Sequence, residues 1–316
     1  MAGFLLRRLG HALLVLLLVC TVTFGIVHAA PGGPSLLADP KLSIAERTAI
    51  AERLGVDRPI PVQYGRWLAR LARGDLGESF LYQTTTVSTI AERLPNTLLL
   101  AGAALFLTIV VAIPLAAWCA EHPGGVADRL AGALALGAIS VPVFWLGILS
   151  ILAFAVHAHL LPAGGASDVG GSDSLLDRLR HLLLPALVLA AAGTAELFRY
   201  TRASALAQAA RPFVRTARAK GVPDRHVRWR HTMRNACIPV VTVIGLQLPR
   251  LVGGAAITET VFSWPGMGRL GIEAALARDY PLVMGITFLV SIGVLLASLL
   301  VDLAYLALDP RLRPRA

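Results

Sequence analysis

Residues 97–120 read TLLLAGAALFLTIVVAIPLAAWCA, without one charged side chain. An α-helix rises about 1.5 Å per residue, so roughly 20 apolar residues cross the hydrocarbon core of a bilayer, which is about 30 Å thick. The rest of the chain has the same character, because 56% of its 316 residues are hydrophobic and only 15% are charged. This composition excludes an ordinary soluble domain and predicts an all-α membrane protein.

Five further apolar runs lie on either side of this stretch. Two runs hold an ionisable side chain, Glu196 in the fourth and Arg250 in the fifth. Charged groups at membrane depth are costly, and they usually face a pathway or a partner helix. Together with Thr97–Ala120 the runs predict six membrane-spanning helices, the others being His11–Ala30, Leu130–Val156, a run that begins at Leu182, Ala236–Thr258 and Pro281–Val301.

Loop charges predict the orientation of these helices. The segment from Arg199 to Ala236 holds ten Arg or Lys residues and one acid, and such loops stay on the cytoplasmic side of a membrane. Six crossings then place both termini in the cytoplasm, where Arg7 and Arg8 lie at one end. The net charge of +10 belongs to these membrane flanks rather than to one basic face, which argues against a nucleic-acid-binding protein.

The segment between the first two runs mixes acids with arginines, as expected of a small helical external piece. Ser43 and Glu46 form a capping box that predicts a helix over Ser43–Leu54. A second, amphipathic helix is expected over Gln63–Arg73. A cleaved signal peptide is the alternative for the first run, but its removal would leave five crossings.

This organisation predicts three parts along the chain. The third part is a short cytoplasmic tail, and a basic loop at about 211–235 lies within the second. The expected boundaries are 1–95 for the first membrane helix with the external segment, 96–308 for the core with the other five helices, and 309–316 for the tail.

The sequence carries no catalytic motif that we recognise. It lacks a His-Glu-x-x-His zinc motif, a Gly-x-Ser-x-Gly elbow and a Walker A phosphate loop. Gly266–Gly271 matches the Gly-x-Gly-x-x-Gly dinucleotide pattern, but it follows a membrane run instead of a buried strand. His157 and His159 do not share a helix face and have no acid or cysteine nearby. We therefore expect no enzyme, cofactor or metal site on this chain.

The basic loop contains the most informative motif. Its residues Thr216–Gly221 are followed by Pro223, which predicts a short helix that stops at Gly221. The small alanine side chains of this helix would let another protein surface approach closely. The alternative is a basic helix that lies on anionic lipid.

At these residues the sequence resembles the integral-membrane permeases of bacterial ABC importers, in particular the dipeptide, oligopeptide and nickel branch. One departure from the wider importer pattern is Arg215, which holds the place of the glutamate that usually opens the coupling motif. This departure is typical of the peptide and nickel branch. The resemblance spans nearly the whole chain and is carried by Thr216–Gly221, Arg234–Asn235, Ile238–Pro239, Glu259–Gly268, Arg278–Pro281 and Leu308–Arg311.

The resemblance implies a type I ABC importer permease fold, in a subunit that passes peptides across the bacterial cell membrane (the inner or plasma membrane) by alternating access. The implied partners are a second permease subunit, two ATPase subunits that carry ATP and Mg, an extracytoplasmic substrate-binding protein and membrane lipid. A nickel or glutathione importer is the alternative within the family. A secondary transporter is the alternative outside it, and would be expected to show repeated halves or acidic coupling groups at mid-depth.

The site residues follow from the resemblance and from membrane depth. For the translocation pathway we expect Arg250, Ser140, Pro142 and Phe144. The alternatives are snorkelling of Arg250 to the outer interface or an interhelical hydrogen bond of its side chain, and a packing kink at Pro142. The resemblance assigns contact with the external binding protein to Phe262, Trp264, Pro265 and Gly266. It assigns ATPase coupling to Thr216, Ala217, Arg218, Ala219, Lys220, Gly221, Arg234 and Asn235.

Overall fold

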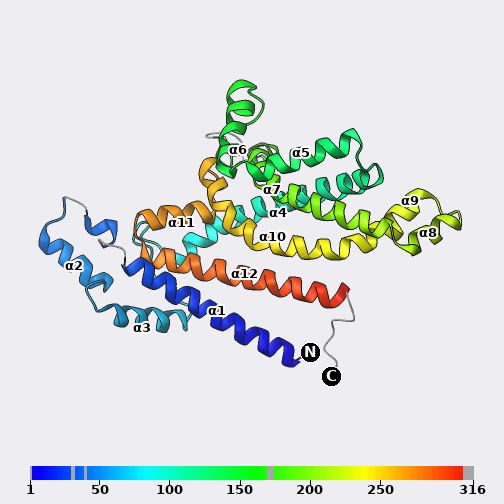
Figure 1. The fold of residues 1–316 in the computed structure, drawn as a ribbon. Coiled ribbons are helices and arrows are strands. Elements are labelled where there is room, and N and C mark those ends of the chain that lie inside the picture. Colours follow the sequence, from blue (N-terminus) through cyan, green and yellow to red (C-terminus); the bar gives the residue numbers. More distant parts are fainter. Residues whose placement is uncertain (1, 30–32, 39–40, 169–173, 309–316) are drawn as a thin grey trace. The chain divides into compact units, whose positions relative to one another are not determined.

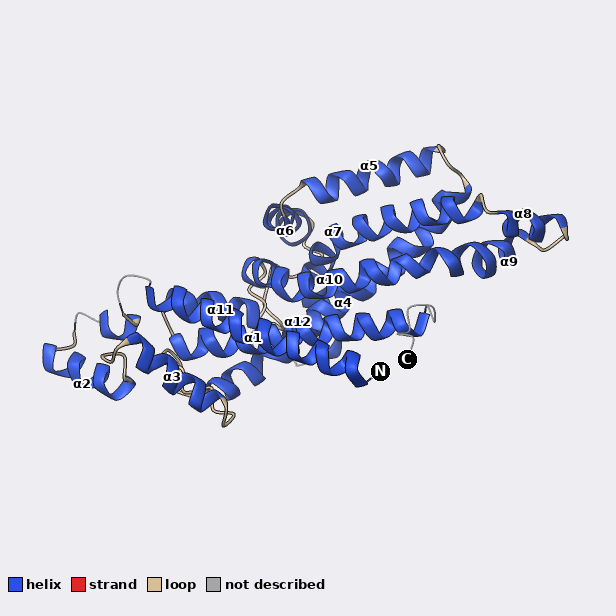
Figure 2. Ribbon diagram, turned by 60° about the horizontal axis from the view of Figure 1, so that its bottom comes forward, coloured by secondary structure: helices blue, strands red, loops and turns tan. Residues whose placement is uncertain are grey.

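The computed structural model describes residues 2–29, 33–38, 41–168 and 174–308, without the side chains of 2–6, 238–239, 249–254 and 304–308. Every regular element in the described part is a helix (Figure 2), which confirms the all-α prediction there. One isolated antiparallel bridge joins Glu78 and Thr85. The chain divides into two compact units, a first unit of Met1–Asn96 with Pro265–Leu295 and a second unit of Thr97–Trp264 with Leu296–Ala316.

Figure 1 follows the order of the helices from blue to red. The first unit contains α1 (Ala2–Ala29), the 3₁₀ helix η1 (Ser35–Ala38), α2 (Ile44–Leu54), α3 (Ile60–Leu71), the start of α4 (Thr86–Glu121), α11 (Met267–Leu276) and the first part of α12 (Tyr280–Leu308). The second unit contains the rest of α4 and of α12, α5 (Val126–Ser140), α6 (Val143–Ser150), the π-helix η2 (Ile151–His157), α7 (Leu175–Ala209), α8 (Pro212–Ala219), α9 (Asp224–His226), the π-helix η3 (Val227–Met233) and α10 (Arg234–Val261).

The two predicted helices after α1 are present. The hydroxyl oxygen of Ser43 accepts the Glu46 amide at 3.2 Å, while the Glu46 carboxylate accepts the Ser43 amide at 2.8 Å. This capping box confirms the predicted start of α2. The Ser43 hydroxyl, at 2.7 Å, and the Ser43 amide both donate to the Glu46 carboxylate, and these two hydrogen bonds lower the pKa of Glu46. α3 begins at Ile60, before the predicted Gln63, because Pro61 is tolerated in a first turn whose N–H groups have no helical partner.

Asp279 organises the start of α12. Its fully buried carboxylate accepts the Ser79 hydroxyl at 2.5 Å and the amides of Leu81 at 3.0 Å and Leu282 at 3.1 Å. The Leu282 amide lies in the first turn of the helix and has no intrahelical partner, so the carboxylate acts as a cap and complements the helix dipole. The segment Arg278–Pro281 therefore has a structural role in the first unit.

In the second unit, α7 packs against both α5 and α10 (Figures 1 and 2). Small residues let membrane helices approach closely and form the core of these contacts. Where α10 packs against α7, the side-chain amide of Gln247 on α10 donates to the carbonyl oxygen of Gly193 on α7 at 3.1 Å. The buried small side chains in this core are Ala112, Ala116, Ala131, Ala135 and Ala195.

The predicted span over Leu130–Val156, in which Pro142 was expected to cause at most a kink, is broken into two helices at this proline. α5 ends at Ser140, α6 begins at Val143, and the two arms are bent by 107°. Pro142 has no N–H, and its ring disfavours the helical conformation of the residue before it. Val141 accordingly has an extended backbone, with φ −87° and ψ 126°. Hydropathy continues through the break, so Pro142 is the one sequence signal of it, and the size of the bend is not predicted.

Four helices in the described part are long and apolar enough to cross a membrane, or five if the bent pair forms one span. The fifth predicted run lies in α10, where several side chains are outside the described part. Many large apolar side chains point outward, as expected of lipid-facing helices, and Leu13 and Leu14 of α1 are 67% and 63% exposed. The four helices are Arg7–Ala29, Thr86–Glu121, Leu175–Ala209 and Tyr280–Leu303.

The loop after η2 is held against the end of α10 by a glycine contact. The Gly165 amide donates to the Phe262 carbonyl oxygen at 2.8 Å, and a Cβ on Gly164 would overlap that same oxygen. Since a backbone oxygen cannot move aside like a side chain, we expect Gly164→Ala to lower the free energy of unfolding by about 2 kcal/mol. Thermal unfolding in detergent measures this.

Gly102→Ala is the control for this substitution, because a Cβ on Gly102 would meet nothing within 4 Å. Alanine favours a helix over glycine, so the control should melt at or slightly above the wild-type temperature. If Gly164→Ala melts as high as the control, the close approach to Phe262 is refuted.

Candidate functional site

α8 is the short helix predicted from the coupling motif. Pro212 occupies its first turn, where the missing N–H is not needed. The helix stops before Gly221, whose φ of +74° is a left-handed value that glycine adopts without steric cost. This confirms the predicted helix and its stop. Figure 1 shows α8 and α9 where α7 ends and α10 begins.

α8 is held by a small apolar core of its own. Val214 and Ala217 are 0% and 7% exposed and pack with Val227 of η3, beside the half-buried Val222. The remaining positions do not contribute to this core, so they are available to a partner. The exposed residues on α8 and just after it are Phe213, Arg215, Thr216, Arg218, Ala219, Lys220 and Gly221.

The second part of the predicted coupling set lies at the start of α10. Arg234 is exposed, whereas Asn235 is half-buried and donates from its amide Nδ2 to the carbonyl oxygen of His231 at 2.8 Å. Asn235 therefore satisfies a backbone acceptor of the π-helix that precedes it. The hydroxyl of Ser204 on α7 donates to the Ala236 carbonyl oxygen at 3.0 Å and joins α7 to α10 near this point.

Two ion pairs connect these elements to α4 and α5. Arg228 of η3 pairs with Glu121, the last residue of α4. Arg202 of α7 pairs with Asp128 of α5, with Nη2 and Oδ2 2.6 Å apart, and the same carboxylate accepts the Gly124 amide at 2.9 Å. Neither pair is predicted from the sequence, because the members of each pair are 107 and 74 residues apart. The available sequence signal was Asp128, an acid in the first turn of the apolar helix α5, which indicates a need for a cationic partner.

We expect the Asp128–Arg202 pair to be needed for stability. Asp128 is 7% exposed, and removing its carboxylate leaves a partly buried guanidinium without its partner. Loss of one member of a buried pair is costly, so Asp128→Ala should lower the free energy of unfolding by about 2 kcal/mol after allowance for the exposed part of Arg202. The double variant Asp128→Ala/Arg202→Met should recover part of this loss. Melting in detergent checks both, and full additivity of the two substitutions contradicts the coupling.

A cavity of about 910 Å³ lies between α5 and α7, next to this ion pair. Its volume is in the upper part of the range of ligand pockets, and its charged wall is unusual for two membrane helices. The Tyr200 hydroxyl and the apolar Leu136 complete a mixed surface. The charged residues that line the cavity are Asp128, Arg129, Glu196, Arg199 and Arg202.

Three of the four residues that the sequence suggested for the pathway lie at the bend between α5 and α6, and the fourth lies in α10. Arg250 lies in α10, but its side chain is outside the described part. The Ser140 hydroxyl donates to the Leu136 carbonyl oxygen at 2.8 Å, Pro142 forms the bend, and Phe144 is 46% exposed on α6. None of Ser140, Pro142 and Phe144 lines the α5–α7 cavity.

The four residues expected to contact an external binding protein are divided between the units. Phe262 and Trp264 are each 1% exposed and pack inside the second unit. Pro265 and Gly266 belong to the first unit, where the Pro265 carbonyl oxygen accepts the Asn96 side-chain amide at 2.9 Å. The two aromatic side chains therefore hold this segment in place rather than presenting an apolar surface.

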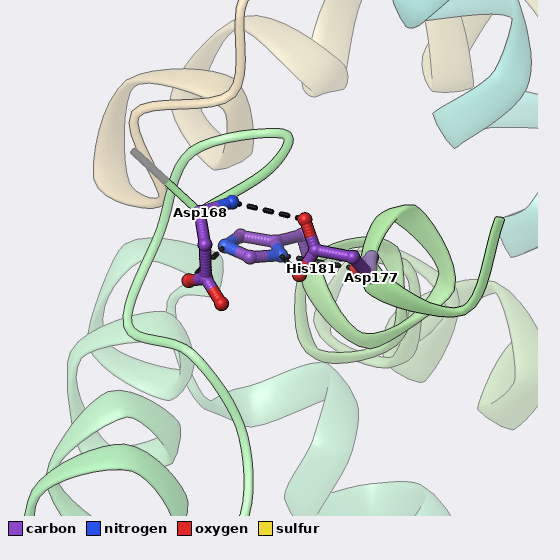
Figure 3. Close-up of side chains that lie close together, drawn as sticks. All are labelled: Asp168, Asp177 and His181. Carbon is purple, nitrogen blue, oxygen red and sulfur yellow. Dashed lines mark hydrogen bonds and ion pairs between the residues drawn. The ribbon is translucent and has the colours of Figure 1, made fainter. Parts of the chain in front are cut away.

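Asp168, Asp177 and His181 form a cluster that the sequence does not predict, and their ligand-type atoms lie within 4.8 Å of one another. Figure 3 shows the imidazole between the two acids. Nδ1 lies 3.0 Å from the Asp177 carbonyl oxygen, and Nε2 lies 3.6 Å from the Asp168 carboxylate. The Asp168 amide donates to the Asp177 carboxylate at 3.0 Å. Since the two ring nitrogens face different acids, the cluster fits a set of polar contacts that hold the loop at Asp168 against α7 better than it fits a metal site.

Two family models match the chain. The description "binding-protein-dependent transport system inner membrane component" applies to residues 112–314, and the corresponding N-terminal model matches residues 1–101. Together they cover both units of the structure.

Full-length relatives agree with these models. The chain is 38% identical to the oligopeptide transport system permease protein AppB of Bacillus subtilis and 37% identical to the dipeptide transport system permease protein DppB of Escherichia coli, over 99% of each chain. It is 36% identical to the glutathione transport system permease protein GsiC of Salmonella paratyphi A, again over 99% of both. The protein therefore belongs to the family of inner-membrane components of binding-protein-dependent transport systems.

Proposed function

We propose that this chain is the translocation subunit of an ATP-driven importer that passes dipeptides or oligopeptides across the cell membrane. The observation that carries the proposal is the exposed face of α8, a short helix anchored by its own core in a chain of this family. The names of the oligopeptide and dipeptide permeases support peptides as the substrate. The glutathione permease, itself a relative at lower identity, makes glutathione the alternative substrate.

The proposed assembly joins this chain to a second, homologous permease, two ATPase subunits and an extracytoplasmic binding protein. Six membrane crossings place both termini in the cytoplasm, with α2 and α3 outside. The core runs over residues 96–308, and the ATPases bind ATP and Mg, since this chain carries no Walker A motif. The loop charges support this orientation.

In the proposed mechanism, closure of the ATPases moves α8. The Arg228–Glu121 pair links η3 to the end of α4, and the Arg202–Asp128 pair links α7 to α5. These ion pairs couple the movement of α8 to the helices around the α5–α7 cavity. The cavity then opens alternately to each side of the membrane. We assign the polar wall of that cavity, including Glu196 and Arg199, to the translocation pathway.

Affinity purification of the tagged chain from mild detergent tests the assembly. We expect a second permease and Walker-motif ATPases to co-purify. Competition for uptake of a labelled dipeptide by other dipeptides, glutathione and chelated nickel then separates the substrate classes. A chain that purifies alone and still transports peptide contradicts the proposal.

A further inference from the structure

A second cavity, of about 150 Å³, lies wholly within the first unit. α1, α2, α3 and the start of α12 form its walls. Phe24, Trp67 and Tyr280 make one wall aromatic, and the Phe24 and Trp67 ring centroids are 6.3 Å apart. Arginines on α2 and α3 add positive charge to the lining. The lining of the cavity is therefore partly aromatic and partly cationic.

The cavity lies at the level where two membrane spans end. The apolar part of α1 ends at Ala29, and that of α12 begins at Tyr280. The ring centroids of His28 and Tyr280 are 4.6 Å apart, so these two ends of the apolar stretches lie side by side. Tyrosine and tryptophan favour this interface, and lipid phosphates lie there too. On α3, Ile60 and Val62 expose 49% and 42% of their surface, as suits a helix lying in the interface.

Three arginines supply the cationic wall. Arg66 and Arg70 lie one turn apart on α3, and Arg53 is in the last turn of α2. Within the described part of the chain, no hydrogen bond or ion pair engages these three guanidinium groups. The carboxylates that line the same cavity are Glu52 and Asp75, so cationic groups outnumber anionic ones.

We propose that this cavity binds the headgroup phosphate of an anionic phospholipid. Arg66 and Arg70 donate to the phosphate oxygens, because the guanidinium fork matches phosphate in two-point hydrogen bonding. The glycerol and the first part of the acyl chains lie along the aromatic wall at Trp67 and Tyr280. The excess of cationic groups favours an anionic headgroup over a zwitterionic one. The site is separate from transport and does not depend on the proposed function.

Native mass spectrometry of the purified full chain in detergent tests the site, with dioleoylphosphatidylglycerol as the probe. We expect saturable binding to the wild type and about thirtyfold weaker binding to Arg66→Gln/Arg70→Gln. The matched control is Arg58→Gln/Arg73→Gln, which removes two exposed arginines of the same segment that do not line the cavity. This control should bind like the wild type. Arg66→Lys/Arg70→Lys keeps the charge and should bind with intermediate affinity. This variant tests the role of the guanidinium groups even if the glutamine variant folds poorly.

Further probes distinguish a lipid site from a site for soluble phosphates. Glycerol 3-phosphate should not displace the lipid, and dioleoylphosphatidylcholine should bind more weakly. Equal lipid binding by the Arg66→Gln/Arg70→Gln variant and its control overturns the proposal, because it shows non-specific lipid around the helices. Binding of glycerol 3-phosphate as tight as that of the lipid also overturns it, in favour of a soluble ligand.

Discussion

Replacing Ala219 with tyrosine is expected to abolish ATP-driven transport while the chain still folds and enters the membrane. Ala219 is exposed on α8 and lies outside the core of Val214, Ala217 and Val227, so a larger side chain does not disturb the helix itself. A partner surface that fits small side chains cannot accept a tyrosine ring. We expect a loss of about 3 kcal/mol in docking, or roughly a hundredfold in affinity for the ATPases.

Uptake of labelled peptide and recovery of the ATPases after purification measure this effect together. Ala275→Tyr is the matched control, because Ala275 is also an exposed alanine on a helix, in the last turn of α11. The control should transport and co-purify normally. Equal behaviour of the two tyrosine variants would mean that α8 is not the coupling surface.

Replacing Asp279 with alanine should have the largest effect on stability. The substitution leaves the Ser79 hydroxyl and the Leu81 and Leu282 amides without their acceptor in a fully buried place. Each buried donor without a partner costs about 1 to 3 kcal/mol, so the free energy of unfolding should fall by at least about 3 kcal/mol. The melting temperature in detergent and the yield of monodisperse protein measure it.

Two further variants sharpen the Asp279 experiment. Asp279→Asn keeps one carbonyl oxygen as an acceptor and should be intermediate. Asp57→Ala removes an exposed carboxylate from the same unit and should melt like the wild type. If Asp279→Ala also melts like the wild type, the three hydrogen bonds do not support the start of α12.

Local signals predicted most of the secondary structure. Ser43 and Glu46 predicted the start of α2, and Gly221 predicted the stop of α8, because the residues that decide each boundary lie within one turn of it. Apolar runs likewise predicted the helices at α1, α4, α7 and α12. Hydropathy marks only the apolar part of a helix, however, and α4 begins well before Thr97, at Thr86.

The features that the sequence did not predict depend on partners far along the chain. Asp128 and Arg202 look like two unrelated charges until the packing of α5 on α7 brings them together. The carbonyl oxygen of Phe262 gives no sequence signal for its contact with Gly164. Pro142 predicts a kink, but a proline alone does not give the size of the bend, which depends on packing. Side-chain roles in the pathway were therefore the least predictable part of the site.

Peptide uptake by proteoliposomes is the decisive test of ATP-driven import through this chain. The complex recovered by affinity purification of this chain would be reconstituted, with labelled dipeptide and the binding protein on one side and ATP on the other. We expect uptake that requires hydrolysable ATP, persists without a proton gradient and is lost in the Ala219→Tyr variant. Uptake by the purified chain alone, driven by a proton gradient and indifferent to ATP, would contradict it.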